Sequence, residues 1–215
     1  NITLDKAYSE LKRNYDGYHF SKNMVGMYNP FSLLNAFDSL EIGSYWFETG
    51  TPSYLVELLK RHDFKLDELK GNKVTANVLS AIDASSSDPI PVIFQSGYLT
   101  ISGYNERYKL YSLDFPNEEV REGFMLYLMP YYTSVSVNKT GFQISCFVEE
   151  VKGGDITAFM TRLESFFANV PYDLIKDTEN HYQNVLFILC NLCGLYTKAE
   201  YHTSDGRVDM TIETP

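Results

Sequence analysis

Three polar residues stand out in the largely apolar stretch that ends the chain. Glu179 and Gln183 are four residues apart, so on a helix they share one face. Asp209 lies inside an apolar run that is typical of a β-strand. A charge there must face water or a ligand, because an unpaired buried carboxylate is costly. Spacing alone therefore leaves two alternatives for Asp209: a side chain on the wet face of the sheet, or a side chain that faces a ligand.

A helix followed by a β-hairpin would position these residues. Gly194 stands where a helix commonly ends with a glycine. Lys198–Thr203 and Arg207–Thr214 have strand character, and Asp205-Gly206 between them is a hairpin signal. Residues on two sides of the helix are apolar, so we expect burial on more than one face. These are Tyr182, Val185, Leu186, Leu189, Cys190 and Cys193 on one side, and Phe187, Ile188 and Leu192 on the other.

The order E-x-x-Y-Q on a helix, then G-R-V-D on a strand, resembles the opening of a PD-(D/E)XK nuclease-like domain. The particular resemblance is to the domain attached to AAA-ATPase-like proteins. It implies that Asp209 is a metal ligand, that Glu179 faces the same site, and that Gln183 supports it. The family completes this site with a later strand carrying E-x-K, and the sequence ends at Pro215 before any such motif.

Four further segments resemble the region that follows the ATPase core in the same family. The lone His19 invites a catalytic role, but no nucleophile or acid partner lies nearby in sequence. We therefore expect His19 to pack and to form hydrogen bonds. The four segments are Tyr15–Ser21, Tyr28–Ser32, Tyr45–Gly50 and Gln95–Thr100.

The sequence contains no G-x-x-x-x-G-K-[ST] motif to cradle phosphates. We therefore expect that the chain alone does not hydrolyse ATP. Because the lysine of the E-x-K motif is also missing, we expect that it does not cleave DNA either. The resemblance implies Mg²⁺ for the complete parent site, and we expect no cofactor in this chain.

The middle of the chain has helices followed by two strand-like runs, Tyr98–Ile101 and Arg107–Leu113, around Gly103-Tyr104-Asn105. This order is similar to a winged-helix module. Only Arg107 and Lys109 are basic in the wing, so protein contact is favoured over DNA binding.

Local signals place the other helices. Thr3, Asn29, Asn117 and Asp155 are expected N-caps, and Pro30 follows Asn29 at the first helical position. Inward positions on the second helix are predicted to be Leu33, Leu34 and Phe37. Residues 142–151 fit a helix or a strand equally well; Gly153-Gly154 after them favours the helix, preceded by a polar linker over 133–141.

Composition sets further limits. The net charge of −10 argues against a broad nucleic-acid-binding face. The hydrophobic content of 44% is enough for a core, and no apolar run approaches the ~18 residues of a membrane span. Three cysteines without framework spacing fit a reducing cytoplasm, and Cys190-x-x-Cys193 in an apolar helix is expected to pack rather than to bind zinc.

We therefore predict an α+β protein, mainly helical, with a winged-helix-like middle and a partial restriction-endonuclease-like C-terminal unit. The expected parts are residues 1–132, a helical connector over 133–172, and the nuclease-like opening over 173–215. Two function classes stay open: part of a metal-dependent nuclease, or a non-catalytic regulatory or interaction module. Partners are nucleic acid through the longer protein, another protein, or a second copy pairing at the open edge of the last strand; a membrane is not expected.

Overall fold

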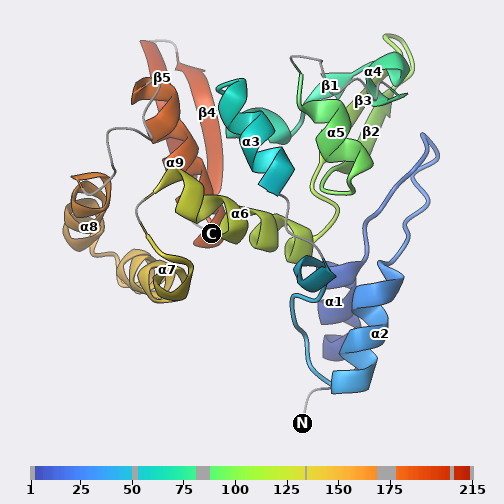
Figure 1. The fold of residues 1–215 in the computed structure, drawn as a ribbon, viewed down its shortest axis with the longest axis horizontal. Helices are drawn as coiled ribbons and strands as arrows, with labels where there is room; N and C mark the ends of the chain where they lie inside the picture. Colours follow the sequence, from blue (N-terminus) through green and yellow to red (C-terminus); the bar gives the residue numbers. More distant parts are fainter. Residues whose placement is uncertain are drawn as a thin grey trace. The chain divides into compact units, whose positions relative to one another are not determined.

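The computed structural model describes residues 3–49, 53–80, 88–133, 135–168, 178–203 and 206–213 (Figure 1). The chain is divided into two compact units. Unit 1 comprises Asn1–Phe64 and Glu68–Phe124, and unit 2 comprises Lys65–Asp67 and Met125–Pro215. Both helices and antiparallel strands are present, which confirms the α+β class.

Three helices, the first two of unit 1 and α6, begin where local signals predicted them. The Thr3 and Asn29 side chains accept backbone N–H groups at the starts of the first two helices, and Asn117 does so for the helix that leaves the unit. That helix, α6, crosses the unit boundary. The helical segments are α1 (Leu4–Tyr15), α2 (Pro30–Ser39), η1 (Trp46–Thr49), α3 (Ser53–Arg61), η2 (Leu66–Leu69), α4 (Ala76–Ser80), α5 (Ile90–Gln95) and α6 (Glu118–Tyr132); Leu66 and Asp67 of η2 belong to unit 2.

A three-stranded antiparallel sheet of order β1-β3-β2 completes unit 1, from Lys73–Val74, Leu110–Asp114 and Thr100–Asn105. The predicted turn at Gly103-Tyr104-Asn105 was wrong, because these residues continue β2. The register shifts between Ile101 and Gly103, so the glycine marks a bulge instead. The turn lies at residues 106–109, where the Asn105 side chain accepts the Tyr108 N–H.

The burial of α2 differs from the prediction. Leu34 is 65% exposed and Phe37 is 55% exposed, so neither faces inward. The buried positions of α2 are the small residues Ser32 and Ala36. The periodicity identified which side of α2 is apolar, but this side is not the buried one. The small side chains of Ser32 and Ala36 allow the opposite side of α2 to approach the rest of unit 1. Before α2, a single antiparallel bridge joins Tyr18 and Met27.

In unit 2, α7 (Val137–Lys152) contacts α8 (Ile156–Ala168). The choice of helix for residues 142–151 is confirmed, and α7 begins at Val137, inside the segment predicted as a linker. Phe147 packs edge-on against Phe159 and Phe166, with ring centroids 5.4 and 6.0 Å away. Asp155 caps α8 by accepting the Ala158 N–H at 2.9 Å.

The last elements are α9 (Thr178–Leu192), β4 (Tyr196–Thr203) and β5 (Gly206–Glu213). Helix, glycine and hairpin follow in the predicted order, and Gly194 has φ +72° as a helix-ending glycine requires. β4 and β5 pair antiparallel, and α9 contacts β4 (Figure 1). The buried residues lie on more than one side of α9, as expected: Val185, Phe187, Ile188, Leu189 and Cys190.

Candidate functional site

The two predicted helix residues of the metal site lie near the start of α9. Glu179 is in the first turn and is exposed, while Gln183 is one turn later and half-buried. A four-residue separation on a helix places them on the same face. An acid in the first helical turn is also favoured by the positive end of the helix dipole.

Asp209 lies in the middle of β5. The pairs Ala199–Met210 and Tyr201–Val208 flank it, so Asp209 stands across from Glu200 of β4 in the ladder. The side chains of β4 and β5 are outside the described residues, and so is the shared site that the resemblance implies for Glu179 and Asp209. Within the described part of the chain no three His, Cys, Asp or Glu side chains gather as metal ligands would.

A row of buried polar residues on α9 was missed by the apolar pattern. Asn180, His181, Asn184 and Asn191 are all less than 10% exposed. Asn184 accepts the backbone N–H of Leu66 at 2.8 Å, and thereby ties the short segment Lys65–Asp67 into unit 2. The His181 ring lies against that of Tyr132, with centroids 6.3 Å apart. One feature of the sequence could have indicated these buried polar residues. They recur along a helix whose apolar residues already occupy two of its sides, so few positions remain that could face water.

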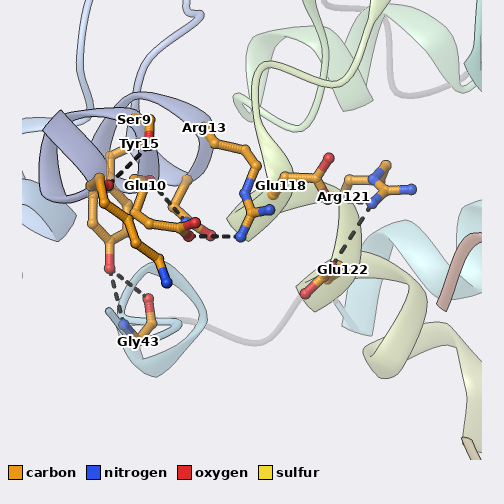
Figure 2. Close-up of polar contacts among 10 residues, drawn as sticks. Ser9, Glu10, Arg13, Tyr15, Gly43, Glu118, Arg121 and Glu122 are labelled. Carbon is orange, nitrogen blue, oxygen red and sulfur yellow. Dashed lines mark hydrogen bonds and ion pairs between the residues drawn. The ribbon is translucent and has the colours of Figure 1, made fainter. Parts of the chain in front are cut away.

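Hydrogen bonds between tyrosine side chains and backbone groups join separate segments of unit 1. The Tyr15 hydroxyl donates to the Gly43 carbonyl at 2.9 Å and accepts the Gly43 N–H at 3.0 Å (Figure 2). The Tyr18 hydroxyl donates to the Gly97 carbonyl at 3.2 Å. Tyrosines of the first segment therefore hold two later loops in place.

His19 has a structural role, as expected. Its backbone N–H donates to the Thr100 hydroxyl at 2.6 Å, and that hydroxyl donates to the His19 carbonyl. Its ring Nδ1 lies 3.0 Å from the Ile101 carbonyl oxygen, so this nitrogen carries the proton and donates. The His19 side chain thus fastens the Tyr18–Met27 arm to β2.

Glu119 is a buried carboxylate that no local sequence pattern marks as a site residue. It is 4% exposed, and its Oε1 accepts the N–H groups of Tyr45 and Trp46 at 2.7 and 3.0 Å. Burial raises the pKa of Glu119, which the nearby Ser32 hydroxyl and the two backbone donors partly offset. The Ser32 hydroxyl approaches this carboxylate without completing a hydrogen bond. Sequence could suggest only that Glu119 follows the N-cap of α6.

Two arginines form ion pairs with neighbouring acids, one on α1 and one on α6. Arg13 of α1 bonds Glu10 at 2.6 Å, and Arg121 contacts Glu118 and Glu122 (Figure 2). Burial raises the pKa of Glu122, the Glu118 charge raises it further, and Arg121 and Arg13 lower it. The carboxylates of Glu10, Glu118 and Glu122 outnumber the two guanidinium groups, so the arginines offset most but not all of the negative charge.

Aromatic rings fill the space between the segments of unit 1. The Tyr98 ring lies 4.8 Å from both Trp46 and Phe124, and 5.9 Å from Phe47. A Cβ on Gly123 would lie 2.3 Å from the Phe47 ring, so this contact requires glycine. The recognisable segments therefore build a packed core.

A hollow of about 650 Å³ lies between α7 and α8, and hydroxyl and amide side chains line it. Arg162 pairs with Glu150 in this hollow, because Arg162 Nε and Nη2 both lie 2.6 Å from Glu150 Oε1. The third charged residue of the lining, Asp155, accepts the Ala158 N–H at the start of α8. The polar lining includes Gln143, Thr157, Thr161 and Ser165.

The Cys190-x-x-Cys193 pair packs in unit 2, as expected. Burial raises the pKa of Cys190 to about 12, with a smaller contribution from Cys193. Burial and the Glu150 charge raise the pKa of Cys193 to about 11. Thiolates are therefore scarce at neutral pH.

Alkylation at pH 8 is expected to modify the half-buried Cys146 well before the other two thiols. Cys190 and Cys193 should react at least about tenfold more slowly than in the urea-unfolded chain, because the thiolate is the reacting form. Mass spectrometry of chymotryptic peptides after timed iodoacetamide treatment measures each rate. Equal native and unfolded rates for Cys190 would contradict its burial.

Comparison with known proteins gives one informative relative. A curated protein of Azotobacter chroococcum mcd 1, described as an uncharacterized protein in the vnfD 5' region, is 33% identical over 217 aligned positions. The alignment covers 94% of this chain and 40% of the relative, so the chain spans well under half of the relative's length. No family model and no solved structure matches the chain. No described helix is both long and apolar enough to cross a membrane.

Proposed function

We propose that the chain belongs to a longer, metal-dependent nuclease-like protein, and that α9, β4 and β5 open its catalytic domain. Asp209 would hold Mg²⁺, Glu179 would act as an accessory acid of the same site, and Gln183 would support it. The relative's greater length is consistent with further catalytic residues elsewhere in the polypeptide.

The observation that carries the proposal is the helix–hairpin order of the last elements. α9 runs directly into β4 through Gly194, and β4 returns as β5. Glu179 is on α9, which contacts β4, and Asp209 is on β5, which pairs with β4. Only β4 therefore stands between the element that carries Glu179 and the element that carries Asp209, and this supports a shared site.

The register adds a second argument. The backbone register sets Asp209 across from Glu200, so a second position that carries an acid neighbours Asp209 in the ladder. Mg²⁺ prefers carboxylate oxygens of this kind, and a bound Mg²⁺ can activate water for phosphodiester hydrolysis.

The middle of unit 1 is proposed to be a winged-helix module with a protein-contact role. α3, β1, α4, α5, β2 and β3 follow one another, and β1 pairs with β3. The exposed turn between β2 and β3 carries two basic residues, Arg107 and Lys109, and one acidic residue, Glu106. One acid among two bases does not make the basic face that DNA binding needs.

The alternative is a non-catalytic module that couples to other proteins. It is favoured by the way unit 1 uses its polar segments: His19, Tyr15 and Glu119 all bond to backbone groups within the unit. The two alternatives differ in what Asp209 does.

In a protein extended to the relative's full length, Asp209→Asn is expected to reduce Mg²⁺-dependent DNA cleavage by at least about 100-fold. Even the outer partners of metal ligands cost about 10–100-fold when removed, and a ligand should cost no less. Glu179→Gln is expected to reduce cleavage by about 10-fold or more. Plasmid nicking at fixed Mg²⁺ or Mn²⁺ concentration measures both.

Matched substitutions at exposed acids provide controls: Asp38→Asn in α2 and Glu164→Gln in α8 should leave cleavage unchanged. Absence of any metal-dependent cleavage by the extended protein would favour the non-catalytic alternative. If the Asp209→Asn variant still cleaves DNA at the original rate, the assignment of Asp209 as a Mg²⁺ ligand is wrong.

A further inference from the structure

The hollow between α7 and α8 is lined by polar side chains that recur at helical spacing. Gln143 and Glu150 are seven residues apart on α7, which is about two turns, so they lie on one face. Thr157, Thr161 and Ser165 follow one another at every fourth residue of α8 and form a row of hydroxyl groups. The volume of about 650 Å³ lies within the range of small-molecule sites.

The charges of the lining disfavour both kinds of ion. Two carboxylates, Glu150 and Asp155, and one guanidinium, Arg162, give the lining a formal charge of −1. An anion would therefore face two like charges. A cation that approaches Glu150 would instead meet the Arg162 guanidinium, which lies against the same carboxylate.

One oxygen of the Glu150 carboxylate is left for a further donor. Both Arg162 nitrogens converge on Oε1, while Oε2 is buried and has no hydrogen-bond partner among the described residues. A buried oxygen without a donor costs free energy, so an added donor there is stabilising. The Glu150 side chain is 13% exposed, and its terminal torsion is soft, so the two oxygens can exchange places beside Arg162.

The hydroxyl groups of α8 offer acceptors. The Thr161 hydroxyl donates to the Thr157 carbonyl at 2.9 Å, and the Ser165 hydroxyl donates to the Thr161 carbonyl at 3.0 Å. Because each hydroxyl has a single hydrogen, these oxygens present lone pairs. Donors come from the Gln143 amide and from the N–H groups of Arg162 beyond the two that contact Glu150.

We propose that this hollow binds a small neutral polyol, of the size of a mono- or disaccharide. Each hydroxyl of a polyol both donates and accepts, so it can donate to Glu150 or Thr161 and accept from Gln143. An ammonium group can only donate, and a carboxylate or phosphate can only accept, so neither matches this mixed lining. Phe166 also lines the hollow and offers apolar surface to the C–H groups of the ligand.

This inference goes beyond the proposed nuclease function and does not depend on it. The hollow is built by α7 and α8, and the proposed metal site by α9 and β5. Failure of one proposal leaves the other intact.

NMR titration of the ¹⁵N-labelled 215-residue chain with maltose and with sorbitol tests the proposal. Saturable shifts are expected for the backbone amides of Gln143, Thr161 and their neighbours. Thr161→Val keeps the shape of the side chain and removes its oxygen, so it should weaken binding by about 3- to 10-fold, the worth of one neutral hydrogen bond. Gln143→Ala should weaken binding by a similar factor, and it tests the opposite wall of the hollow.

Ser145→Ala provides the matched control. Ser145 is exposed on α7, its hydroxyl donates to the Phe142 carbonyl at 2.8 Å, and it does not line the hollow. This substitution should leave polyol binding unchanged.

Three results would overturn the proposal. The first is the absence of saturable shifts with either polyol at concentrations well above the millimolar range. The second is polyol binding that neither Thr161→Val nor Gln143→Ala weakens, which would place the ligand elsewhere. The third is saturation of the same amides by putrescine or by citrate without any response to the polyols, which would identify an ionic ligand.

Discussion

Gly17→Ala is expected to destabilise unit 1 by about 3 kcal/mol or more, from the combined effects of backbone strain and overpacking. Gly17 has φ +108°, a conformation that side chains rarely adopt, and an added Cβ would lie 2.0 Å from the Pro116 carbonyl oxygen. Backbone atoms cannot move aside as a flexible side chain can. Denaturation followed by the fluorescence of Trp46 measures the effect, because Trp46 is the chain's one tryptophan and lies in unit 1.

Gly71→Ala separates the two causes. Gly71 also has positive φ, +73°, but nothing lies within 4 Å of its added Cβ. Its substitution should cost only the backbone strain, about 1 kcal/mol. If Gly17→Ala costs no more than Gly71→Ala, the close approach to Pro116 contributes nothing.

Glu119→Ala is the second substitution with a large expected effect, about 2–4 kcal/mol on the unfolding of unit 1. The change leaves the N–H groups of Tyr45 and Trp46 without their carboxylate acceptor, and hydrogen bonds to a charged group are worth about 1.5–3 kcal/mol each. Glu119→Gln keeps an acceptor oxygen of similar shape and should cost clearly less. Urea denaturation followed at Trp46 compares the two variants; equal losses would show that the acceptor does not matter.

The pH dependence of stability offers an independent readout of Glu119. Burial raises its pKa in the folded protein above the ordinary 4.5, so the folded state binds this proton more tightly than the unfolded state. The contribution to the free energy of unfolding is therefore fully present below pH 4.5 and is lost as the pH rises through the raised value. Burial shifts the pKa of Asp114 and Glu122 in the same direction. Glu119→Gln should flatten this slope, and an unchanged slope would exclude Glu119 as a source.

Local signals predicted the ends of elements well. Asn29, Asn117 and Asp155 cap helices because their side chains bond to backbone groups two or three residues away. Gly194 ends α9 for an equally local reason. Such contacts are contained within a few residues, so the sequence holds all of their information.

The direction in which a helix faces was less predictable. The pattern of α2 identified an apolar side, but the side that packs within unit 1 is the one with Ser32 and Ala36. Gly103 was interpreted as part of a turn, but it lies at a bulge in β2. Turns and bulges both use the wide range of backbone conformations that glycine allows, so the residue type does not distinguish them. Both outcomes depend on neighbours that are distant in sequence.

The candidate site follows the same division. Glu179 and Gln183 share a helix face, which spacing alone predicted. Glu119 and Asn184 act through Tyr45, Trp46 and Leu66, which lie 74, 73 and 118 residues away in sequence. No local pattern marks such pairs.

The bond between Asn184 and Leu66 has a consequence for the order of events during synthesis. Leu66 is fully buried in a unit whose other residues begin at Met125. When the ribosome has made the first half of the chain, the Leu66 N–H still lacks its acceptor, and a loop of 118 residues must close before it is satisfied. Contacts of such long separation slow folding. In nascent chains that stop before α9, we therefore expect Lys65–Asp67 to remain accessible to proteases and chaperones. This should hold even where the residues on both sides of this segment have already folded.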